Sequence, residues 1–462
     1  MTPPEVERSA IDGLLFVDLA VHRDGRGWFK ENWQRAAMVA AGVPDFGPVQ
    51  HNVAYNDREG VTRGVHAEPW DKFVSLVAGE IFGAWVDLRP GPAFGTVVTR
   101  RIRPETAVFV PRGVGNSYQT LQPGTAYSYL VNRHWSREAV GSYTFVNLAD
   151  ETLAIPWPLA LDAAEVSEAD RTHPRLAEVT PMTPLRTVIL GAGGQVGRAL
   201  ARILPQAHAL TRAEFDLADS GQVAGFDWDG VSTVINAAAY TAVDLAETPE
   251  GRRDAWATNV TGVARLVEAC RANQIRLVHL SSDYVFDGTA AEHPEDEPFS
   301  PLGVYGQTKA AGDVLVGTWQ RHYIVRTSWV IGDGKNFVRT MADLAARGVS
   351  PSVVNDQVGR LTFADDLAAG IAHLLSTDAP FGTYNLTNTG PVQSWADIAA
   401  DVFELCGRDP ADVRPVSTEE YAGGRNLAPR PERSPLALDA ITGAGFVPGA
   451  ARERLAGIVR PS

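Results

Sequence analysis

Gly191-Ala-Gly-Gly-Gln-Val-Gly197 is the stretch that decides the fold of the C-terminal half of the chain. It follows the apolar run Thr187–Leu190 and opens a stretch with helical periodicity, Val196–Leu204. Glycines between a strand and a helix let backbone amides approach a pyrophosphate at the helix N-terminus, where the helix dipole favours anions. A tight turn without a ligand is the alternative. The flanking strand and helix favour a dinucleotide loop, to which we assign Gly191, Gly194, Gln195, Val196 and Gly197.

Short apolar runs alternate with helical stretches on either side of this loop. Val260–Asn273 is one of the helical stretches. The candidate buried strands are Val188-Ile-Leu190, Thr233-Val-Ile235, Arg276–Leu280 and Tyr323-Ile-Val325. This alternation predicts an α/β Rossmann domain with a doubly wound parallel sheet, whose ligands bind at the carboxyl ends of the strands.

A second motif in this half, Tyr305-Gly-Gln-Thr-Lys309, carries chemistry. Tyrosine and lysine four residues apart share one helix face, so the ammonium is expected to lower the pKa of the phenol. Such a tyrosine can donate a proton to a carbonyl while a hydride arrives from a nicotinamide. Ser282, just after the strand Arg276–Leu280, can hydrogen-bond the same carbonyl; the alternatives are a turn cap for Ser282 and a solvated helix face for the pair. Together with the glycine loop, the motif predicts a nucleotide-dependent oxidoreductase.

Arg212 bears on the choice of cofactor. An NAD-selective fold places an acidic residue on the ribose about twenty residues after the loop, where this sequence offers Thr211 and Arg212. An arginine suits a 2′-phosphate, so we expect NADPH to be preferred, with use of NADH also open. A solvated charge at a strand end is the alternative for Arg212.

Composition limits the class of protein. The chain has 462 residues, which suggests two domains, and a net charge of −14 with dispersed acidic residues, which argues against a nucleic-acid partner. The partner is expected to be a small molecule. Cys270 and Cys406 are its two cysteines, no apolar run reaches membrane-spanning length, and the N-terminus lacks a signal pattern. We therefore expect a cytoplasmic protein that does not enter a membrane.

The N-terminal half has a different pattern. Residues 11–158 contain short alternating apolar segments broken by glycine, as in Lys72–Leu88, and little helical periodicity apart from Trp33–Ala41. This pattern predicts an antiparallel sandwich or barrel. Residues 160–184 are rich in Ala, Glu, Asp, Thr and Pro without an apolar period, which predicts a linker. The expected domains are therefore residues 1–159 and 185–462, joined by the linker 160–184.

The C-terminal half also resembles a known family. The motifs are Asn236-Ala-Ala-Ala-Tyr-Thr-Ala-Val-Asp244, Ser281-Ser-Asp-Tyr-Val-Phe-Asp-Gly288, Tyr305–Lys309, Arg326-Thr-Ser-Trp-Val330 and Arg430-Pro431. They resemble the dTDP-4-dehydrorhamnose reductases, extended short-chain dehydrogenases with a small substrate-binding lobe. The resemblance implies a catalytic triad of Ser282, Tyr305 and Lys309, which uses NADPH or NADH. It adds Asp216, Ala237 and Ala238 to the cofactor site, and Tyr240, Asp283, Trp329 and Arg430 to the substrate pocket. Tyr240 and Trp329 could equally be core aromatics, and a magnesium ion is an open expectation without assigned ligands.

The N-terminal half resembles the dTDP-4-dehydrorhamnose 3,5-epimerases, which are cupin-type jelly rolls. The motifs are Asp24-Gly-Arg-Gly-Trp-Phe-Lys-Glu31, Gly60-Val-Thr-Arg-Gly-Val-His66 and Val110-Pro-Arg-Gly113. The resemblance implies His66 as the base, Lys72 on the enolate, Tyr129 as the returning acid, Arg63 on the nucleotide phosphate and Asp150 orienting His66. It implies Gln50, Asn52, Asn116, Arg26 and Glu31 as further substrate contacts. A metal cupin is not expected, because His51, His66 and Glu68 do not form a persuasive ligand set.

Two hypotheses follow. In the first, one chain epimerises dTDP-4-dehydro-6-deoxy-D-glucose at C3 and C5, where the 4-keto group acidifies the protons, and then reduces the 4-keto group to give dTDP-L-rhamnose. In the second, the N-terminal domain only binds nucleotide sugar or mediates dimerisation, because Asn116 stands where the family usually has histidine and cannot act as an acid or base. Another 6-deoxy-L-hexose product stays open. A homodimer is expected.

Overall fold

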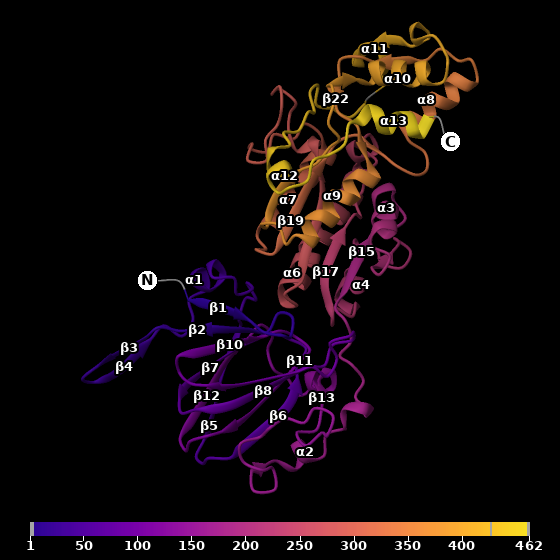
Figure 1. Ribbon diagram of the computed structural model, residues 1–462. Helices are drawn as coiled ribbons and strands as arrows, with labels where there is room; N and C mark the ends of the chain where they lie inside the picture. The colour runs from indigo at the N-terminus through magenta and orange to yellow at the C-terminus, as the bar shows by residue number, and fades with distance from the viewer. Residues whose placement is uncertain (1–3, 426, 460–462) are drawn as a thin grey trace. The chain divides into compact units, whose positions relative to one another are not determined.

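The chain folds into two compact units, Met1–Leu185 and Arg186–Ser462 (Figure 1). The computed structural model describes residues 4–425 and 427–459. Among the residues that the structure describes, no helix has both the length and the apolar character that crossing a membrane requires.

The first unit is a sandwich of two sheets. One sheet has the strand order β1-β2-β10-β7-β12-β5, and the other has the order β13-β6-β11-β8-β9, with β14 parallel to β6. The strands are β1 (Glu5–Arg8), β2 (Leu15–Asp18), β5 (Gln50–Asn56), β6 (Val61–Ala67), β7 (Lys72–Ala78), β8 (Ile81–Asp87), β9 (Val97–Ile102), β10 (Thr106–Val110), β11 (Val114–Thr120), β12 (Thr125–Val131), β13 (Thr144–Phe145) and β14 (Glu165–Val166). A separate hairpin is formed by β3 (Val21–Asp24) and β4 (Gly27–Lys30). The short helices are α1 (Arg35–Ala40), η1 (Glu138–Ser142), α2 (Glu168–Arg171) and η2 (Leu176–Glu178).

Alternating side chains explain why these strands form a sandwich. Residues from both sheets point into one core, where the rings of Phe16 on β2 and Trp85 on β8 meet edge to face with centroids 5.4 Å apart. Burying such a side chain stabilises the fold by roughly 1.5–3 kcal/mol. The predicted sandwich of residues 11–158 is confirmed, and α1 lies within the predicted helical stretch Trp33–Ala41.

The segment 160–184, predicted to be a linker, is instead part of the first unit. β14 pairs with β6, and Leu176 and Met182 are buried against the second sheet. The chain here wraps around the sheet as short pieces, so its apolar residues have neither the period of a strand nor that of a long helix. The missing period was therefore a poor sign of a linker.

The second unit is built on a parallel sheet with the order β16-β15-β17-β18-β19-β24. Its strands are β15 (Arg186–Leu190), β16 (His208–Leu210), β17 (Val231–Asn236), β18 (Arg276–Ser282), β19 (His322–Thr327) and β24 (Gly382–Asn385). Each neighbouring pair runs in the same direction. The order reverses between β15 and β17, where open α/β sheets place their ligands. The predicted parallel sheet is confirmed.

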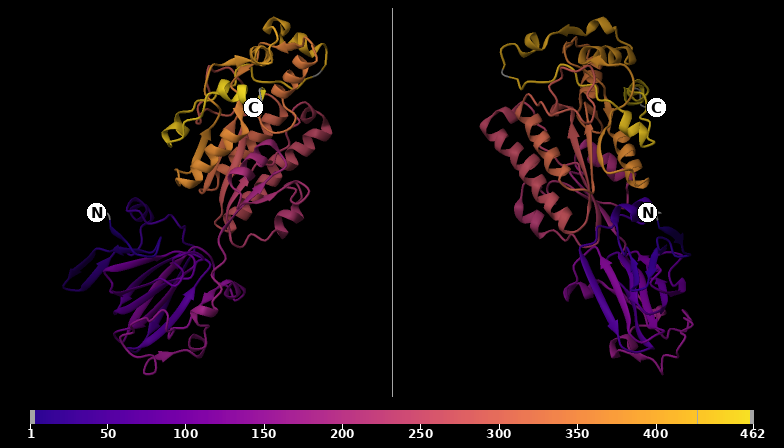
Figure 2. Two further views of the ribbon diagram at one scale, coloured as in Figure 1. Left: turned by 45° about the vertical axis from the view of Figure 1, so that its right-hand side comes forward. Right: turned by 90° about the vertical axis from the view of Figure 1, so that its left-hand side faces the viewer.

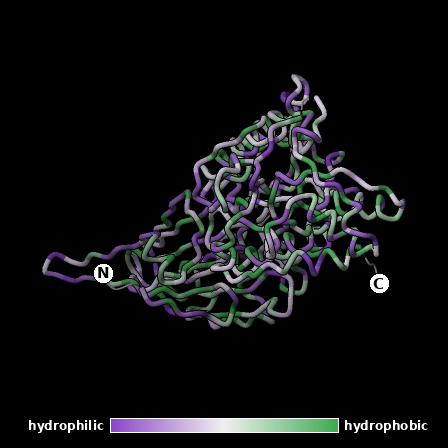
Figure 3. Tube along the Cα trace, turned by 90° about the horizontal axis from the view of Figure 1, so that it is seen from above, coloured by the Kyte–Doolittle hydropathy of each residue, from purple (hydrophilic) through white to green (hydrophobic). Residues whose placement is uncertain are grey.

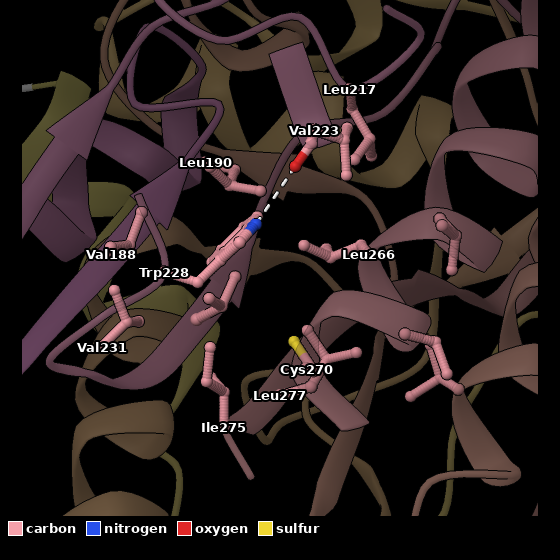
Figure 4. Close-up of a cluster of buried hydrophobic side chains, with 14 of the residues drawn as sticks. Val188, Leu190, Leu217, Val223, Trp228, Val231, Leu266, Cys270, Ile275 and Leu277 are labelled. Atoms are coloured by element: carbon pink, nitrogen blue, oxygen red, sulfur yellow. Dashed lines mark hydrogen bonds between the residues drawn. The ribbon is translucent and has the colours of Figure 1, made fainter. Parts of the chain in front are cut away.

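Helices cover both faces of this sheet (Figure 2). One face carries α3 (Gln195–Ile203), α9 (Ala364–Ser376) and α12 (Asp439–Gly443), and the other carries α4 (Ser220–Gly225), α6 (Val263–Ala272) and α7 (Val304–Gly317). Figure 4 shows the core on the second face, where Trp228 lies among aliphatic side chains and its indole Nε1 donates to the Val223 carbonyl at 3.1 Å. Because the sheet is buried on both faces, its strands read as continuous apolar runs.

A small lobe completes the second unit. It contains the paired strands β20 (Val330–Ile331) with β23 (Thr362–Phe363), β21 (Ser352–Val354) with β26 (Arg414–Val416), and β22 (Val358–Gly359) with β25 (Gln393–Ser394). Its helices are α8 (Phe337–Ala346), α10 (Trp395–Leu405), η6 (Pro410–Asp412), α11 (Thr418–Ala422) and α13 (Ala451–Val459). The remaining helical elements are η3 (Leu245–Glu247), α5 (Pro249–Trp256), η4 (Ala257–Gly262) and η5 (Asp283–Val285). α8, α10 and α13 share their own apolar core.

Candidate active sites

The glycine loop lies between β15 and α3, at the point where the sheet order reverses. Gly191 has a φ of +79°, and a Cβ there would lie 2.6 Å from the Ala238 nitrogen. A Cβ on Gly197 would lie 2.2 Å from the Gly191 carbonyl oxygen. Both positions therefore require glycine. Gly194 begins α3 and has no side chain with which to cap it, so the first-turn N–H groups remain available to an anion.

Other residues predicted for the cofactor site lie against this loop. The Ala237 amide donates to the Leu190 carbonyl at 3.0 Å, which brings Ala237 and Ala238 beside Gly191. The Gln195 side chain accepts from the Gly332 amide at 2.8 Å. The structure thus brings the ends of β15 and β17 together around one site.

Arg212 lies two residues beyond the end of β16, the edge strand beside β15. Its side chain is 79% exposed, and its Nε donates to Asp216 at 3.2 Å. Glu214 accepts from the amide and the hydroxyl of Thr211 at 2.8 and 2.7 Å. The turn after β16 is therefore ordered by side-chain bonds, and the guanidinium of Arg212 is open to solvent.

Ser282, Tyr305 and Lys309 come together from β18 and α7. Ser282 is the last residue of β18, and Tyr305 and Lys309 lie one turn apart at the start of α7. The Tyr305 phenol is hydrogen-bonded to Ser282, and the Lys309 ammonium donates to the Leu280 carbonyl at 2.7 Å. The three predicted side chains therefore meet at the carboxyl end of a central strand.

Burial sets the protonation of this group. Burial raises the pKa of Tyr305 to about 12, against the effect of its hydrogen bond with Ser282. Burial lowers the pKa of Lys309 to about 8, against the charge of Asp313. The expectation that the lysine gives the phenol a lower pKa is wrong for the net shift, because desolvation of the phenolate dominates. The phenol stays protonated, which is the form that donates a proton.

Sequence reasoning missed two buried groups behind Lys309. His279 on β18 places its Nε2 3.4 Å from the Lys309 Nζ, and its Nδ1 lies 3.1 Å from the Asn236 amide nitrogen. The Asn236 oxygen accepts from the Ala238 amide at 3.2 Å. These contacts connect the turn beside the glycine loop to the lysine. A histidine inside an apolar run was the available signal.

A cavity of about 440 Å³ in the second unit is the candidate substrate pocket. Its walls come from the small lobe and from two loops after sheet strands: Asp244, Tyr284, Phe337, Thr340, Met341, Ser352, Val353, Val354, Gln357, Trp395, Thr418, Tyr421, Arg425, Leu427 and Arg430. The Arg430 guanidinium donates to both oxygens of Asp244, at 2.9 and 3.0 Å. The Tyr284 ring lies edge to face with Tyr305, with centroids 5.5 Å apart. The pocket therefore adjoins the proton donor.

The other predicted substrate residues of this unit are placed differently. Trp329 stacks on Trp395, a wall residue, with ring centroids 3.9 Å apart. Tyr240 packs with Tyr305 on one apolar cluster. Asp283 is buried and accepts from the hydroxyls of Ser282 and Ser328 at 2.8 and 3.1 Å. Its carboxylate is thus held behind the pocket by serines, and the prediction that it contacts substrate is not supported by its position.

The first unit has a cavity of about 170 Å³ between its strands. It is lined by Ala54, Arg63, Gly64, His66, Glu68, Lys72, Asn116, Tyr118, Tyr127 and Tyr129. An adjoining cavity of about 170 Å³ shares His66, Glu68 and Tyr129 and adds Asn52, Trp70, Val131, Trp135 and Tyr143. The predicted base, cation, acid and phosphate ligand therefore face one space, although they come from β6, β7 and β12.

Glu68, which sequence reasoning did not place in the catalytic set, organises this cavity. Its carboxylate accepts from the Lys72 ammonium at 2.5 Å and from the Trp70 indole at 2.5 Å. Side-chain exposure is 8% for Lys72 and 11% for Glu68, so this ion pair is shielded from water. The Lys72 Nζ also lies 5.0 Å from the Tyr129 ring centre. Burial and the Glu68 charge raise the pKa of Tyr129, which keeps that phenol protonated.

The carboxylate on His66 is Asp170, not Asp150. The His66 Nε2 lies 2.7 Å from Asp170, and Asp170 comes from α2 in the segment predicted to be a linker. Asp150 instead accepts from the backbone amides of Thr152, Leu153 and Leu176, at 2.9, 3.0 and 2.7 Å. It holds a loop in place, so its predicted role toward His66 is wrong.

Asn116 has its oxygen fully engaged. Its Oδ1 accepts from the Trp85 indole at 3.0 Å and from the Tyr127 hydroxyl at 3.2 Å. The amide can therefore offer only N–H donors to a ligand in the cavity.

The remaining predicted contacts lie at or beyond the rim. Gln50 donates to Asn52 at 2.8 Å, and Asn52 lines the adjoining cavity. Arg26 forms an ion pair with Asp24 at 2.6 Å at the turn of the β3–β4 hairpin, and Glu31 is exposed just after it. The hairpin projects from its unit as a largely hydrophilic arm (Figure 3). The structure does not bring Arg26 and Glu31 to the cavity of their own chain.

The described residues contain one group with metal-ligand character. The candidate ligand atoms of His66, Asp170 and His173 lie within 4.8 Å of one another. This set differs from His51, His66 and Glu68, and it coincides with the carboxylate that orients His66. It lies in the first unit, so it gives no support to a magnesium ion in the second.

Comparisons with known proteins match both units. The family model of the RmlD substrate binding domain matches residues 185–461, and that of dTDP-4-dehydrorhamnose 3,5-epimerase matches residues 8–178. The Protein RmlC homolog of Streptococcus pyogenes is 48% identical over 183 residues, which cover 38% of this chain and 92% of that protein.

Reductases match the second unit. The dTDP-4-dehydrorhamnose reductase of Mycolicibacterium smegmatis is 39% identical over 272 residues, which cover 57% of this chain and 81% of that protein. The solved structure of dTDP-4-dehydrorhamnose reductase from Bacillus anthracis, in complex with NADP, is 32% identical, with a TM-score of 0.55, and covers 60% of this chain and 99% of that one. The chain therefore belongs to the RmlD reductase family through residues 185–461, and it carries a domain of the dTDP-4-dehydrorhamnose 3,5-epimerase family in residues 8–178.

Proposed function

We propose that the chain carries out two consecutive steps of dTDP-L-rhamnose synthesis. The first unit epimerises dTDP-4-dehydro-6-deoxy-D-glucose at C3 and C5, and the second reduces the 4-keto group of the product with NAD(P)H. The observation that carries the proposal is that each unit gathers a complete proton-handling set around its own cavity.

In the first unit, His66 removes the proton next to the ketone while Asp170 orients its ring. The enolate oxygen that forms needs positive charge or N–H donors, which Lys72 and Asn116 supply. Tyr129, whose phenol is protonated, returns a proton from another wall of the cavity. Arg63 at the cavity wall is suited to the nucleotide phosphates.

In the second unit, Tyr305 donates a proton to the 4-keto oxygen, which Ser282 also holds by a hydrogen bond. A bound nicotinamide dinucleotide supplies the hydride. The residues fit that group, because the close backbone packing that glycine allows at Gly191 and Gly197 forms a tight turn into α3, whose open N-terminus suits a pyrophosphate. Lys309 holds its charge near the phenol. The exposed side chain of Arg212, which pairs with Asp216, can turn to a 2′-phosphate, which favours NADPH over NADH.

A second candidate function is supported by Asn116. In this alternative the first unit binds nucleotide sugar without turnover, because no acid or base replaces the family's usual histidine at that position. The bonds from Trp85 and Tyr127 hold the amide as a donor, which still suits an enolate, so we favour catalysis. The proposal does not depend on four further expectations. These are a homodimer, a magnesium ion, a cytoplasmic location and the identity of the 6-deoxy-L-hexose product.

The test uses the purified chain with dTDP-4-dehydro-6-deoxy-D-glucose in D₂O. Without NADPH, we expect deuterium to enter C3 and C5, as followed by proton NMR. Addition of NADPH should then consume the ketone. His66→Ala should stop deuterium entry and leave the reduction of separately epimerised substrate intact. Binding of the sugar without any exchange by the wild-type chain would favour the second candidate.

A further inference from the structure

We propose that His279 is a positioning residue of the reductase site. Its ring presents a fixed N–H to the Lys309 nitrogen, and this N–H favours the neutral amine that remains when Lys309 has given up its proton. The proposal rests on the reductase function proposed above.

The Asn236 side chain fixes which nitrogen of His279 carries the proton. The Ala238 amide donates to the Asn236 oxygen at 3.2 Å, so the nitrogen of the Asn236 side chain is the atom turned to the ring. That nitrogen lies 3.1 Å from the His279 Nδ1, and it can only donate. Nδ1 is therefore the acceptor, and the neutral ring carries its proton on Nε2.

The Nε2–H of His279 faces Lys309. The two nitrogens are 3.4 Å apart, and Lys309 also donates to the Leu280 carbonyl at 2.7 Å. An ammonium has no lone pair with which to accept from an N–H group, whereas the nitrogen of a neutral amine can accept. The ring therefore stabilises the amine of Lys309 relative to its ammonium.

Burial holds these side chains in place. Asn236, His279 and Lys309 are 0%, 1% and 2% exposed. Gly312 lies three residues after Lys309 on α7, and a Cβ there would lie 2.8 Å from the Asn259 carbonyl oxygen and 3.5 Å from the His279 Nε2. The helix thus packs closely over the ring, and the hydrogen bonding of the ring depends on its protein neighbours.

Of the two facing groups, Lys309 is the one that titrates in the working range. Burial and the charge of Lys309 hold the pKa of His279 well below its usual range, so the imidazole stays neutral. Burial lowers the pKa of Lys309 to about 8, so Lys309 is an ammonium below that pH and an amine above it. The Nε2–H acts in the same direction as burial.

The other ionisable groups around Lys309 do not replace this effect. The charge of Asp313 on α7 favours the ammonium, and Arg326 on β19 shares the Asp313 carboxylate at 3.0 Å. Tyr305 stays protonated, and Asp283 is bonded to two serine hydroxyls. At the start of α7, Glu247 of η3 accepts from the Val304 amide at 2.8 Å. His279 is thus a neutral group that favours loss of the proton beside a carboxylate that opposes it.

The amine form has a use in the reaction. Tyr305 must regain a proton after it has given one to the ketone. Lys309 lies one turn from Tyr305 on the same face of α7, and its ammonium is an acid that can return the proton. The O–H bond of Tyr305 then forms again, an N–H bond of Lys309 breaks, and the amine takes a proton from solvent. Because His279 stabilises that amine, it eases the return of the proton.

Two variants remove the N–H from Lys309 in different ways. His279→Leu replaces the ring by an apolar side chain of similar size. Asn236→Ala keeps the ring but frees its tautomer, so that Nε2 can offer a lone pair to the ammonium. Val278→Ala is the matched control, because Val278 is equally buried on β18 and belongs to the core on the opposite face of the sheet. Full-length wild type and the three variants would be compared by NADPH oxidation across pH, with substrate that has been epimerised beforehand.

We expect the alkaline limb of reduction to move up by about half a unit or more in both His279→Leu and Asn236→Ala, because Lys309 would hold its proton more tightly. The limb should keep its wild-type position in Val278→Ala. A lower rate in both test variants with the limb in place would mean that His279 only packs the core, and this would overturn the proposal.

A readout without turnover follows the Lys309 proton directly. The lysines of the chain are Lys30, Lys72, Lys309 and Lys335. Carbon-13 NMR of lysines labelled at Cε therefore gives few signals, and Lys309→Met assigns the one of interest. Burial lowers the pKa of Lys30, in the first unit, to about 8 as well, so its signal is an internal reference that should not move.

The NMR titration separates this proposal from the reductase function. We expect the Lys309 pKa to rise in both His279→Leu and Asn236→Ala. An unchanged Lys309 pKa in both variants overturns the proposal, even if reduction is active. If the wild-type chain does not reduce the ketone but the Lys309 pKa rises in both variants, the role of His279 stands and the reductase function fails. If His279→Leu does not fold, the Lys309 titration in Asn236→Ala decides alone.

Discussion

The two candidate sites prepare a proton donor and a proton acceptor in different ways. In the first unit, each buried carboxylate has side-chain partners: Glu68 has Lys72, and Asp170 has two histidines. In the second, Lys309 is 2% exposed, and the pKa values of Tyr305 and Lys309 are set mainly by burial. Hydrogen-bonding partners therefore keep Asp170 ionised in the first site, whereas desolvation dominates at Tyr305 and Lys309 in the second.

This difference follows from the folds. The cavity of a sandwich is reached by long side chains from several strands, so opposite charges meet inside it. At the carboxyl end of a parallel sheet, a helix packs directly on the strand, and the side chains of α7 lose their water before any ligand arrives. Both ways of setting the pKa of a catalytic group can therefore be tested in the same chain.

The largest expected effect is at Tyr305. Tyr305→Phe removes the proton donor, and loss of a positioned acid costs on the order of 10²- to 10⁴-fold in rate. We expect reductase turnover to fall by that amount, as measured by NADPH oxidation, while cofactor binding persists. Deuterium exchange by the first unit of the same variant is the control and should stay at the wild-type rate. A near-normal rate of reduction by Tyr305→Phe would mean that Tyr305 is not the proton donor.

Asp170 and Asp150 form a matched pair for the first unit. Asp170→Asn should slow exchange by roughly 10²-fold, because His66 loses the anion that orients it and stabilises its protonated form. Asp150→Asn disturbs bonds to three backbone amides, so it should lower the melting temperature while exchange persists. The opposite result, with exchange lost in Asp150→Asn alone, would restore the role that the sequence suggested for Asp150.

These two aspartates show how far the sequence could lead. The glycine loop, the strands of the parallel sheet and the Tyr305–Lys309 pair were predictable, because each is a local pattern set by the period of a strand or a helix. The bond between His66 and Asp170 joins residues 104 apart in sequence, in a segment without any apolar period. The side chain of Ser167 accepts from the Asp170 amide, a pattern that marks the start of a helix. A serine at this position was a local signal against a linker.

The direction of the Tyr305 shift was beyond the sequence for a related reason. The spacing of tyrosine and lysine shows that a charge lies near the phenol, but it does not show how much water the packed helix and strand remove. The effect of desolvation on the pKa of Tyr305 proved larger than the effect of the neighbouring charge. Asn116 illustrates the same limit, because its partners Trp85 and Tyr127 come from other strands. Their hydrogen bonds occupy the oxygen of Asn116 and leave its N–H groups as donors, which the sequence alone does not show.

The pH dependence of reduction tests the role of burial. The pKa of Lys309 is lowered to about 8, so the side chain is a cation below that pH and a neutral amine above it. If reduction needs the ammonium, its rate should be full below pH 8 and fall by about tenfold per unit above it. Deuterium exchange over the same pH series should not share this limb, since its groups lie in the other unit. A rate of reduction that stays constant up to pH 10 would mean that burial does not lower the pKa of Lys309 into this range.

The smallest expected effect concerns Arg212, whose exposed guanidinium is controlled neither by burial nor by a strong pair. Its bond to Asp216 is an exposed contact at 3.2 Å, and such pairs contribute about 0–1 kcal/mol, so a 2′-phosphate could displace it at little cost. Arg212→Ala should raise KM for NADPH by about tenfold and leave KM for NADH nearly unchanged, since one charge-assisted contact contributes roughly 1.5 kcal/mol. Arg253→Ala, which removes an exposed arginine paired with Glu250 on α5, is the matched control and should change neither constant. Equal effects of Arg212→Ala on both cofactors would return this arginine to the role of a solvated charge at a strand end, and the expectation that NADPH is preferred would fall with it.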